Sequence, residues 1–364
     1  MAVLVGFGLF IGSFFVLGWN EGRAIHREKT LEAGASQVIS VSADGPAAEN
    51  EGKLVHLSGD AAADADVTDP EFAITATALK LRRNVEMYQW QESEKSDTKQ
   101  KLGGGEETTT TYTYAKGWSS SLIDSTRFQK PDGHTNPHAM AVDGETFVAD
   151  GIHVGKFQLP ASLTEQLNDF ADRRVTEEEA GQTESLGGRK VSLDGNGLYL
   201  GEDAASPIVG DVRVGFATVP TGPVTIVARQ VASTFEPFSV GRIGTIEMIK
   251  AGTFSADNMF REEQASNAMM TWILRLVGFV MMLIGLCMVT NVLSVAASVI
   301  PFLGNIVGAG TGLMAFAIAL PLTLTTIAFA WLAYRPLIGI PLFVAAAACI
   351  YFAIAFLSKS RRKS

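Results

Sequence analysis

The sequence predicts an α+β membrane protein with four transmembrane helices, one N-terminal and three C-terminal, and a large β-rich extracytoplasmic domain between them. Two observations predict this arrangement. The segment from Trp272 to Leu357 has no acidic residue, and its only charged residues are Arg275 and Arg335. All 38 acidic residues lie between Glu21 and Glu263, where short β-branched runs alternate with turn residues.

The C-terminal apolar segment, residues 272–357, is long enough for three crossings, because about 20 apolar residues span a bilayer. We place the crossings at 272–294, 311–333 and 336–357. The break at 295–310 is apolar but rich in Gly, Ser and Pro, so we expect a loop or a segment lying in the interface.

The short tail at residues 358–364 carries four basic residues, and the positive-inside rule places such a tail in the cytoplasm. The first crossing is predicted at residues 1–19, which end in an apolar run with Trp19 at the interface. No basic residue precedes this run and no small-residue cleavage site follows it, so we expect a retained helix rather than a signal peptide. Four crossings put both ends of the chain in the cytoplasm.

Residues 20–254 form the predicted outer domain, and a helical stem at 255–271 leads into the second crossing. The domain is strongly acidic, which disfavours binding to nucleic acid because phosphate neutralisation needs Lys and Arg. It contains no cysteine, since Cys287 and Cys349 both lie in predicted crossings. The domain must therefore be stable without a disulfide.

The longest extended stretch in the outer domain is Phe72 to Trp90, and a Thr- and Tyr-rich strand at Thr108–Trp118 can pair with its end. The charged segment Glu92–Glu107 between them, with three consecutive glycines, predicts a hairpin tip or flexible loop. We expect the paired residues to form the structural spine of the domain: Val85, Met87, Tyr88, Trp90, Tyr112, Tyr114 and Trp118.

Further strands are predicted at 36–41, 54–57, 147–157, 191–193, 198–200, 212–219, 224–231 and 243–249, with a short helix from Ser162 to about Phe170. The segments that start at Asn50 and Asn196 resemble each other, and each precedes a pair of strands. This echo allows two related β lobes of OB-like size.

Candidate contact residues in the outer domain are Lys80, Arg82 and Arg83, a basic cluster in an acidic domain. They could pair with nearby carboxylates or contact lipid headgroups or an acidic partner. His134 and His138 have the spacing of metal ligands on a helix, but the glycine and proline around them predict a structured turn. We predict no metal site, no cofactor and no catalytic residue, because no nucleophile triad or phosphate-binding loop is present.

In the membrane region the polar candidates are few. We expect Arg275 to snorkel to the outer interface, and Thr325 and its neighbours to satisfy carbonyls freed by Pro321. Candidate polar or interfacial residues of this region are Arg275, Asn291, Thr323, Thr325, Thr326, Tyr334 and Arg335.

Several sequence motifs, in the same order along nearly the whole chain, resemble those of the transmembrane protein 43 (LUMA) family. The most specific match is Leu81 to Trp90. Others are Asn20 to Ala24, the turn Gly133 to Ala141 with His134, Asn136 and Pro137, and Trp331 to Pro336. The Ala-, Asp- and Gly-rich composition favours a bacterial member of the family.

The resemblance implies four crossings and one large lumenal or periplasmic domain. For eukaryotic members it implies the endoplasmic reticulum and inner nuclear membrane, and for a bacterial member the inner membrane. It also implies a non-catalytic role in organising other membrane proteins, with membrane lipids as further contacts and self-association compatible with it. The alternatives are a membrane-embedded lipid-handling protein or enzyme that uses polar residues of the crossings, and a small transporter.

Overall fold

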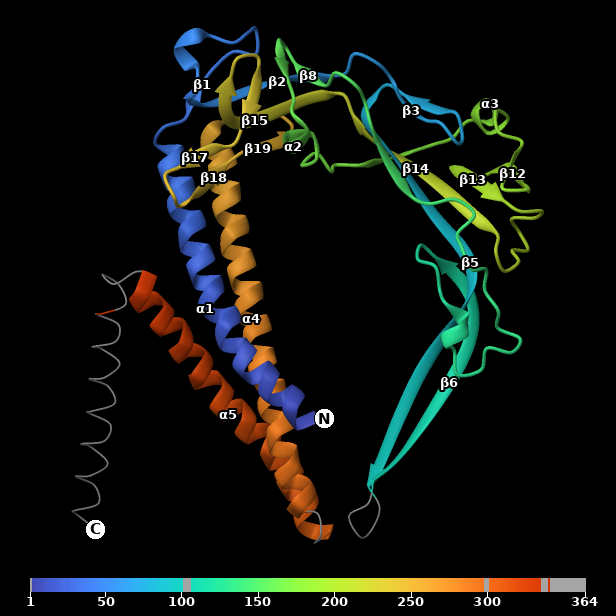
Figure 1. Ribbon diagram of the computed structural model, residues 1–364, viewed down its shortest axis with the longest axis vertical. Helices are drawn as coiled ribbons and strands as arrows, with labels where there is room; N and C mark the ends of the chain where they lie inside the picture. Colours follow the sequence, from blue (N-terminus) through green and yellow to red (C-terminus); the bar gives the residue numbers. More distant parts are fainter. Residues whose placement is uncertain (1, 101–105, 298–300, 335–339, 341–364) are drawn as a thin grey trace.

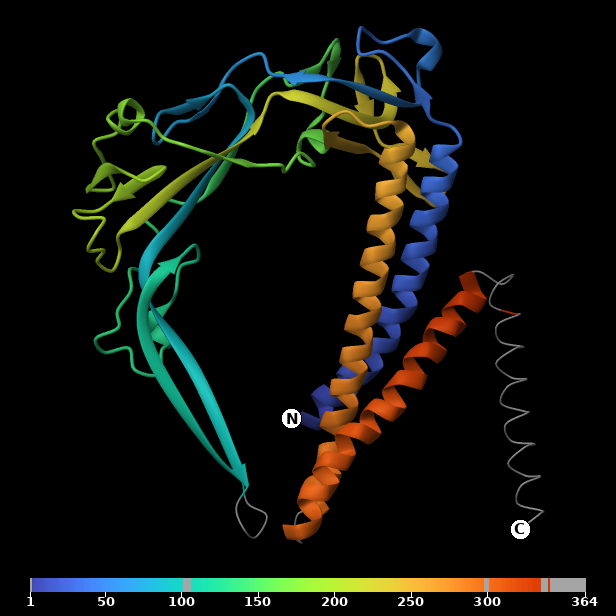
Figure 2. The same cartoon turned by 180° about the vertical axis from the view of Figure 1, so that it is seen from behind.

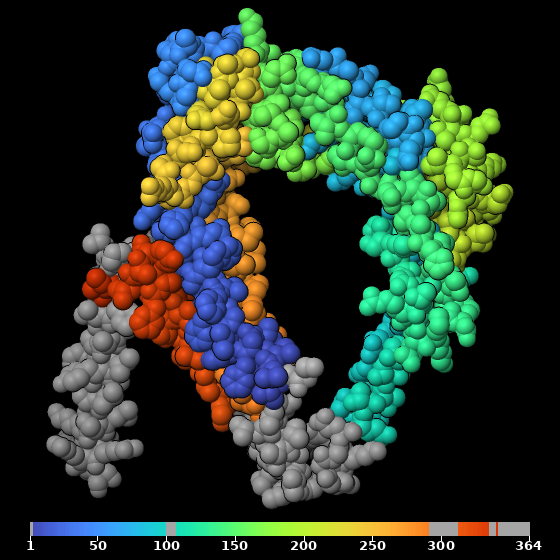
Figure 3. Space-filling view, in the orientation of Figure 1, coloured from blue at the N-terminus to red at the C-terminus, as the bar shows by residue number. Residues whose placement is uncertain are grey.

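The computed structural model describes residues 2–100, 106–297, 301–334 and 340. Three long helices lie together on one side of the molecule, and the β-rich domain arches away from their upper ends (Figure 1). The far end of the arch is a two-stranded ribbon that runs back beside the helices, as the view from behind also shows (Figure 2). An open gap between ribbon and helices is visible in the space-filling view (Figure 3).

The three long helices are α1 (Ala2–Ala35), α4 (Ala256–Ala297) and α5 (Pro301–Tyr334). Each contains a segment long and apolar enough to cross a membrane, so three of the four predicted crossings are present as helices. At 1.5 Å per residue, α1 is about 51 Å long and α4 about 63 Å, well beyond the roughly 30 Å of a bilayer core. The parts of α1 (20–35) and α4 (256–271) beyond the predicted crossings form a two-helix stalk, which the sequence prediction puts outside the membrane.

The helical stem continues into the second crossing as one helix, α4, as the sequence predicts. One boundary differs, because helix α5 begins at Pro301, inside the break predicted at 295–310. A loop over residues 301–310 was therefore wrong, and the other alternative, a segment lying in the interface, stays a prediction. In hydrocarbon every backbone group must be paired within its own segment, which favours helix even in a glycine-rich sequence. The predicted crossing at 336–357, apart from Ile340, and the basic tail lie outside the described residues.

The helices pack closely within the membrane region. Leu17 of α1 is fully buried and packs with Met282 of α4 and Ala319 of α5. A Cβ atom on Gly285 would lie 2.7 Å from the carbonyl oxygen of Gly6. Glycine at both positions therefore lets the backbones of α1 and α4 come into contact, as small residues commonly do in membrane helices.

The first sheet of the β domain has seven strands in the order β16-β15-β2-β8-β9, with β1 beside β2 and β19 beside β15. Its centre is the antiparallel pair β2 (Leu54–Ala62) and β15 (Gly222–Val231). The other strands are β1 (Ile39–Ser40), β8 (His153–Val154), β9 (Phe157–Gln158), β16 (Thr234–Glu236) and β19 (Met248–Ala251).

The second sheet has eight strands in the order β11-β12-β13-β14-β5-β6, with β10 beside β14 and β7 beside β5. Its longest strands are β5 (Ala78–Gln100) and β6 (Glu106–Ser119). The others are β7 (Glu145–Val148), β10 (Ala171–Arg173), β11 (Ser185–Leu186), β12 (Arg189–Asp194), β13 (Gly197–Leu200) and β14 (Val212–Pro220).

Two small hairpins complete the domain, β3 (Val67–Asp69) with β4 (Ile74–Ala76) and β17 (Phe238–Val240) with β18 (Gly244–Ile246). The helices in it are single turns, α2 (Ala161–Thr164) and α3 (Glu177–Ala180). The helix predicted from Ser162 is therefore much shorter than expected. The structure does not establish an OB-like barrel in either sheet, so the OB-like lobes stay a prediction.

The first sheet is fixed to the stalk by a separate apolar cluster. Leu31 of α1 and Phe260 of α4 pack there with Leu54, Val227 and Ile246 of the β domain, and all five side chains are buried. Burial of such side chains stabilises by about 1.5–3 kcal/mol each. The β domain and the stalk are therefore packed as one unit at this junction.

Strands β5 and β6 extend beyond the rest of their sheet as a hairpin. They pair without a register shift from Met87 with Ser119 to Gln100 with Glu106. We call the outer part, residues 92–100 of β5 and 106–114 of β6, the ribbon. Figures 1 and 2 show that it points away from both sheets.

Candidate functional site

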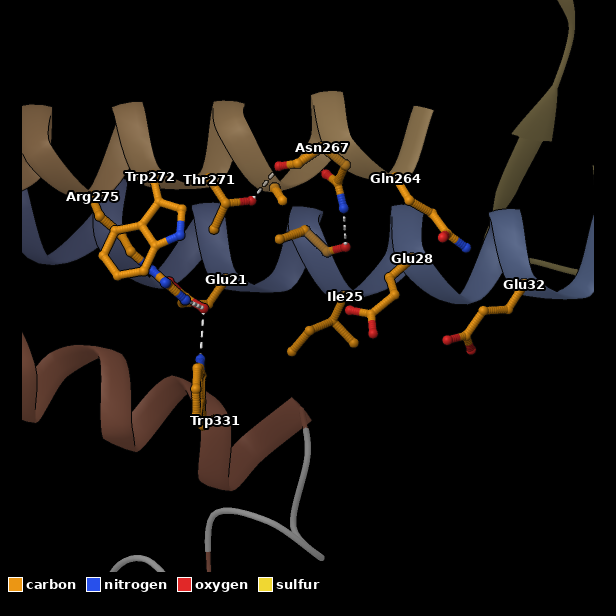
Figure 4. Close-up of a pocket in the computed structure, with 12 residues that line it drawn as sticks. Glu21, Ile25, Glu28, Glu32, Gln264, Asn267, Thr271, Trp272, Arg275 and Trp331 are labelled. Carbon is orange, nitrogen blue, oxygen red and sulfur yellow. Dashed lines mark hydrogen bonds and ion pairs between the residues drawn. The ribbon is translucent and has the colours of Figure 1, made fainter. Parts of the chain in front are cut away.

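A buried ion pair joins the three helices at the lower end of the stalk (Figure 4). Glu21 of α1 is 1 % exposed. Its carboxylate accepts hydrogen bonds from Arg275 of α4, from Nε at 2.6 Å and from Nη2 at 2.8 Å. The indole Nε1 of Trp331 on α5 donates to the same carboxylate at 2.7 Å. Bidentate pairs of this kind fix geometry as well as charge, so one carboxylate orients three helices.

Arg275 points toward Glu21 and two indole rings of the helix bundle, and snorkelling to the outer interface stays a prediction. Its guanidinium lies 4.8 Å from the ring centroid of Trp272 and 5.8 Å from that of Trp331. Its side chain is only 15 % exposed. Because Glu21 and two indole rings offer charge and π contacts that solvent does not match, the inward orientation is favoured.

A second polar layer lies one turn higher on the stalk. Arg23 donates to Asn267 Oδ1 at 2.9 Å, to Thr271 Oγ1 at 3.1 Å and to Asn20 Oδ1 at 3.2 Å. The amide groups of Asn20 and Asn267 in turn donate to the carbonyls of Thr271 and Ala24, at 3.0 and 2.9 Å. All of these bonds except that from Arg23 to Asn20, which lies within α1, cross between α1 and α4 and fix their register.

A hollow of about 380 Å³ opens beside this cluster, between α1, α4 and the end of α5 (Figure 4). Its wall combines the carboxylates of Glu28 and Glu32 with the indoles of Trp272 and Trp331. The other lining residues are Glu21, Ala24, Ile25, Gln264, Asn267, Ala268, Thr271 and Arg275. Among the residues that the structure describes, the lining of the hollow includes no nucleophile paired with a base.

The end of α5 packs directly on α1 at this level. A Cβ atom on Gly22 would lie 2.8 Å from the Tyr334 hydroxyl, and the ring of His26 meets the Tyr334 ring edge-on at 5.9 Å. Tyr334 is 38 % exposed, as expected for an interfacial aromatic residue. Arg335 and the side chain of Asn291 lie outside the described residues.

The threonines of α5 are engaged within the helix bundle. Thr325 and Thr326 donate to the carbonyls of Pro321 and Leu322, each at 2.7 Å. Thr323 is 5 % exposed, and its hydroxyl lies 3.5 Å from the sulfur of Met282. Pro321 frees the carbonyl of Ala317, four residues earlier. None of these three bonds reaches that carbonyl, so the expectation that the threonines satisfy it is not borne out.

The basic cluster of the outer domain is buried rather than presented to a membrane. Arg83, 2 % exposed, contacts both carboxylate oxygens of buried Asp69, at 2.9 and 2.8 Å, and Glu71 at 2.6 Å. Lys80, 4 % exposed, donates to the Leu167 carbonyl at 2.8 Å. Burial lowers the pKa of Lys80, and the charge of Glu165 acts against that shift.

Arg82 alternates to the other face of β5. Its guanidinium lies 4.0 Å from the ring centroid of Phe170, and its Nε is buried without a hydrogen-bond partner in the described part of the chain. Pairing with carboxylates, one of the two interpretations of the cluster, therefore holds for Arg83. Lys80 bonds a backbone carbonyl and Arg82 contacts an aromatic ring instead. Headgroup contact through Lys80 or Arg83 would require the domain to open.

The residues of the expected spine lie on paired strands. Val85 and Met87 are buried in the second sheet, where they pair with Val214 and Val212 of β14. Tyr88 faces Trp118 across the β5–β6 pair, with ring centroids 5.3 Å apart. Aromatic pairs at such distances add to strand pairing.

The turn at His134 closes over the aromatic end of the spine. The His134 ring stacks on Tyr114 at 3.9 Å and meets the edge of Trp90 at 4.7 Å. Asn136 is buried, accepts from the Trp90 backbone N–H at 2.7 Å and donates to its carbonyl at 2.9 Å. Its side chain therefore caps the edge of β5, and Pro137 follows it in the turn.

The ribbon is the part of the outer domain least covered by the rest of the chain. From Ser93 to Lys99 every side chain is exposed, and from Glu107 to Thr113 every side chain is exposed or half-buried. Tyr112 lies in this part and is half-buried, opposite Glu94. Among the residues that the structure describes, no group of three or more His, Cys, Asp or Glu is arranged to hold a metal ion.

Sequence reasoning missed the buried carboxylate that joins the three helices, Glu21. The carboxylate lies just after the predicted first crossing, and it looked like the first acidic residue of a soluble domain. Its partner Arg275 is 254 residues away. The signal that could have linked them is the presence of one carboxylate and one arginine about one turn from the outer end of two apolar segments.

The comparisons with known proteins agree with the resemblance. The family model described as transmembrane protein 43 matches residues 87–336. Transmembrane protein 43 of Mus musculus is 36 % identical over 92 % of this chain and 85 % of its own length. The Homo sapiens protein is 35 % identical over the same shares. The Drosophila melanogaster homologue is 30 % identical over 94 % of this chain and 92 % of its own.

No solved structure matches this one. The relatives named above are animal proteins, and nothing in the comparisons supports the prediction of a bacterial source. The family resemblance itself is confirmed, because the family model covers more than half of the chain and the relatives align over nearly all of it. This chain belongs to the transmembrane protein 43 family.

Proposed function

We propose that this protein is a non-catalytic organiser of other membrane proteins. Its helices anchor it, and its outer domain holds a docking element away from them. The observation that carries the proposal is the ribbon, a paired two-stranded extension. Glu92 and Tyr114 at its base contact the loop that carries His134, and beyond them the side chains from Ser93 to Lys99 are all exposed. A hairpin of this length is marginally stable alone. A partner that covers such a hairpin would stabilise it.

The junction between stalk and sheet supports the same role. Arg27 of α1 binds Glu263 of α4 at 2.5 Å and donates to the carbonyl of Thr245 in β18 at 3.2 Å. Together with the buried cluster around Leu31, these contacts fix the first sheet to the helices. An organiser needs such a rigid link, because a partner held by the outer domain is then held at a defined place relative to the membrane.

The two alternatives, a lipid-handling enzyme and a small transporter, need polar groups that face a substrate or a passage. Glu21, Arg275 and Trp331 instead satisfy one another. Thr323 packs against Met282 rather than opening to a cavity. These contacts favour the organiser over both alternatives.

The proposal includes other membrane proteins as partners, lipids around the helices and self-association as a compatible state. The compartment follows the family resemblance, which implies the endoplasmic reticulum and inner nuclear membrane for eukaryotic members. Microscopy of the tagged full chain in its own host tests that part separately.

The direct test removes the ribbon. Residues 94–112 are replaced by Asn-Gly, so that the paired residues Ser93 and Thr113 close a two-residue turn. A proximity-labelling enzyme is inserted between Gly187 and Gly188, a turn where both glycines have positive φ. The control variant replaces the exposed loop 202–207 with a Gly-Ser sequence of equal length.

We expect the ribbon variant to keep the wild-type melting temperature within a few degrees, because the ribbon adds little to the buried core. It should lose labelled membrane proteins that the wild type and the loop variant both retain. An unchanged set of labelled proteins would exclude the ribbon as the docking element and with it the proposed function.

A further inference from the structure

The two edges of the ribbon are not equivalent, and their backbone geometry shows which groups point outward. In β5, the backbone N–H of Tyr88 donates to the Asp211 carbonyl at 2.8 Å, and its carbonyl accepts from Gly210 at 2.8 Å. Trp90, two residues on, makes its backbone bonds to the Asn136 side chain. The backbone groups of even-numbered residues of β5 therefore point away from β6.

The same alternation applies to β6. Trp118 and Lys116 lie opposite Tyr88 and Trp90, so they form the non-hydrogen-bonded pairs of the ladder. Because the register continues without a shift, the outward-pointing residues of β6 are Thr108, Thr110, Tyr112, Tyr114 and Lys116. No backbone hydrogen bond from these residues to an element other than β5 is present in the described part of the chain.

The edges also differ in charge. The β5 edge carries Glu92, Glu94, Lys95, Asp97 and Lys99, and charged side chains are a common protection of exposed strand edges. The β6 edge has no charge from Thr108 to Ala115, in the sequence Thr-Thr-Thr-Thr-Tyr-Thr-Tyr-Ala. These residue types have high β propensity. The β6 edge therefore has the properties of a strand that accepts a neighbour, and the β5 edge does not.

A second copy of this chain does not fit the β6 edge. Two copies in one membrane are related by a two-fold axis along the membrane normal, and the ribbon runs beside the membrane helices (Figure 1). The two β6 strands would then be parallel with identical residues side by side. In a parallel ladder, a residue whose backbone groups point toward the neighbouring strand lies beside a residue whose backbone groups point away from that neighbour. Here two identical residues, both pointing toward the other strand, would lie side by side. The two β6 strands therefore cannot form a ladder in this arrangement.

We propose that the outer edge of β6 binds an extended segment of a different protein by strand addition, with Thr108, Thr110, Tyr112 and Tyr114 supplying the backbone groups. The inference rests on the proposed organiser function and names the site of docking. Main-chain bonds give such binding its affinity, and side chains at alternate positions give its specificity. The flanking side chains are Thr and Tyr, so the partner segment should be uncharged and rich in β-branched or aromatic residues.

Two proline variants at one residue pair test the edge. Thr110 and Ser96 lie opposite each other, and the backbone N–H of each points outward. Thr110→Pro removes a donor from the β6 edge, and Ser96→Pro removes one from the β5 edge. Neither breaks a backbone bond between the two strands, because proline is tolerated at outward positions of edge strands. Each removes the same side-chain bond, Ser96 Oγ to Thr110 Oγ1 at 3.0 Å, so that loss is matched between the two variants. Both variants should therefore melt like the wild type, and both should fold.

The probe is a fluorescent synthetic peptide, acetyl-Lys-Thr-Val-Thr-Tyr-Thr-Val-Lys-amide, and its fully N-methylated form is the control. Anisotropy is measured against the full chain in nanodiscs. We expect the peptide to bind wild type and Ser96→Pro alike, to bind Thr110→Pro at least tenfold more weakly, and not to bind when N-methylated. Equal weakening by both prolines, or binding of the N-methylated peptide, would overturn edge pairing.

The same variants in the proximity-labelling experiment separate this inference from the proposed function. Loss of labelling in Thr110→Pro and retention in Ser96→Pro supports strand addition. If the ribbon replacement abolishes labelling but Thr110→Pro leaves it intact, the organiser stands and the β6 edge is not its docking site. If neither the ribbon replacement nor Thr110→Pro changes labelling, the organiser function and strand addition at the β6 edge are both contradicted.

Discussion

Glu21 and Arg275 lie 254 residues apart in the chain, and their side chains form two hydrogen bonds of 2.6 and 2.8 Å at the outer end of the helix bundle. The pair is nearly closed to solvent, with side-chain exposures of 2 % for Glu21 and 15 % for Arg275. A pair in such surroundings adds little net free energy over an apolar contact, but losing one partner leaves a buried charge uncompensated. The structural role of the pair is to position α5, because Trp331 of α5 donates a hydrogen bond to Glu21.

The first prediction concerns this pair. Glu21→Gln keeps the shape of the side chain and leaves Arg275 without a counter-charge, which typically costs about 3–5 kcal/mol. We expect a clear fall in the melting temperature of the full chain in nanodiscs, whereas Glu32→Gln, at an exposed position on the same helix, changes little. The double variant with Arg275→Met should recover most of the loss. Equal melting of Glu21→Gln and wild type would show that the pair is dispensable.

The second prediction concerns Arg83. Its guanidinium neutralises Asp69, which is fully buried. Arg83→Ala leaves that carboxylate buried and unpaired, so we expect a loss of about 3–5 kcal/mol in the free energy of unfolding. Arg213→Ala, which removes a partly exposed pair with Glu86, should cost no more than about 1 kcal/mol. Chemical unfolding of the full chain followed by tryptophan fluorescence measures both; similar small losses would argue against a structural role for Arg83.

The cluster at Lys80 to Arg83 shows how far sequence reasoning reaches. The sequence shows three basic residues on a strand in an acidic domain, and this pattern fits an exposed patch and a set of internal pairs equally well. The burial of the three side chains decides between an exposed patch and internal pairs. That burial depends on β7 and β14, which pair with β5 but come from distant parts of the chain. The pairing of Tyr88 with Trp118 was predictable, because one hairpin brings both residues together.

The third prediction concerns Trp90. It contacts the ring of His134 and the ammonium group of Lys116, 4.9 Å from its centroid. Because the side chain is only half-buried, Trp90→Ala should cost toward the lower end of the 3–5 kcal/mol typical for tryptophan. We expect a lower melting temperature of the full chain and faster proteolysis of the turn around His134. A variant that melts like the wild type would place Trp90 on the surface and favour a binding role.

The fourth prediction is a pH dependence at Glu179. Burial alone would raise its pKa, but hydrogen bonds from Arg173 and from Thr176 bring the pKa below the ordinary 4.5. The carboxylate therefore stabilises the fold above its unfolded pKa, and this stabilisation is lost as the pH falls through the lowered value. We expect Glu179→Gln to cost about 1–2 kcal/mol at pH 7 and much less in strong acid. Denaturant curves at several pH values test this, with exposed Glu178→Gln as the control.

A loss at Glu179 that is the same at neutral and acid pH would contradict the charge-based account. It would indicate instead that the geometry of the amide, rather than the missing charge, weakens the capping box at Thr176.

The fifth prediction is the topology. A reporter that is active only in the cytoplasm should be active when fused after Ser364 and silent when inserted within Glu92–Glu107, in the arm that includes the ribbon. The basic tail and the acidic outer domain motivate this assignment. Reporter activity at the second position would reverse the orientation of the domain.

The membrane helices were predictable because apolar length is a local property of the sequence. Their ends were not, since α1 continues to Ala35 through charged residues that read as soluble sequence. The reason is that α1 and α4 support each other outside the membrane through contacts such as Arg23 with Asn267. The same limit applies to Glu21, whose role depends on three helices that meet only in the folded chain.

Helix α4 runs from Ala256 to Ala297 without interruption, and its first turns pack into the β domain while its last turns lie at membrane level. Such a helix acts mechanically as a lever about 63 Å long. A change of tilt of about 10°, within the range that membrane helices adopt as bilayer thickness varies, moves one end relative to the other by roughly 11 Å. Lipid composition around the anchor would thus set how far the outer domain leans over its neighbours.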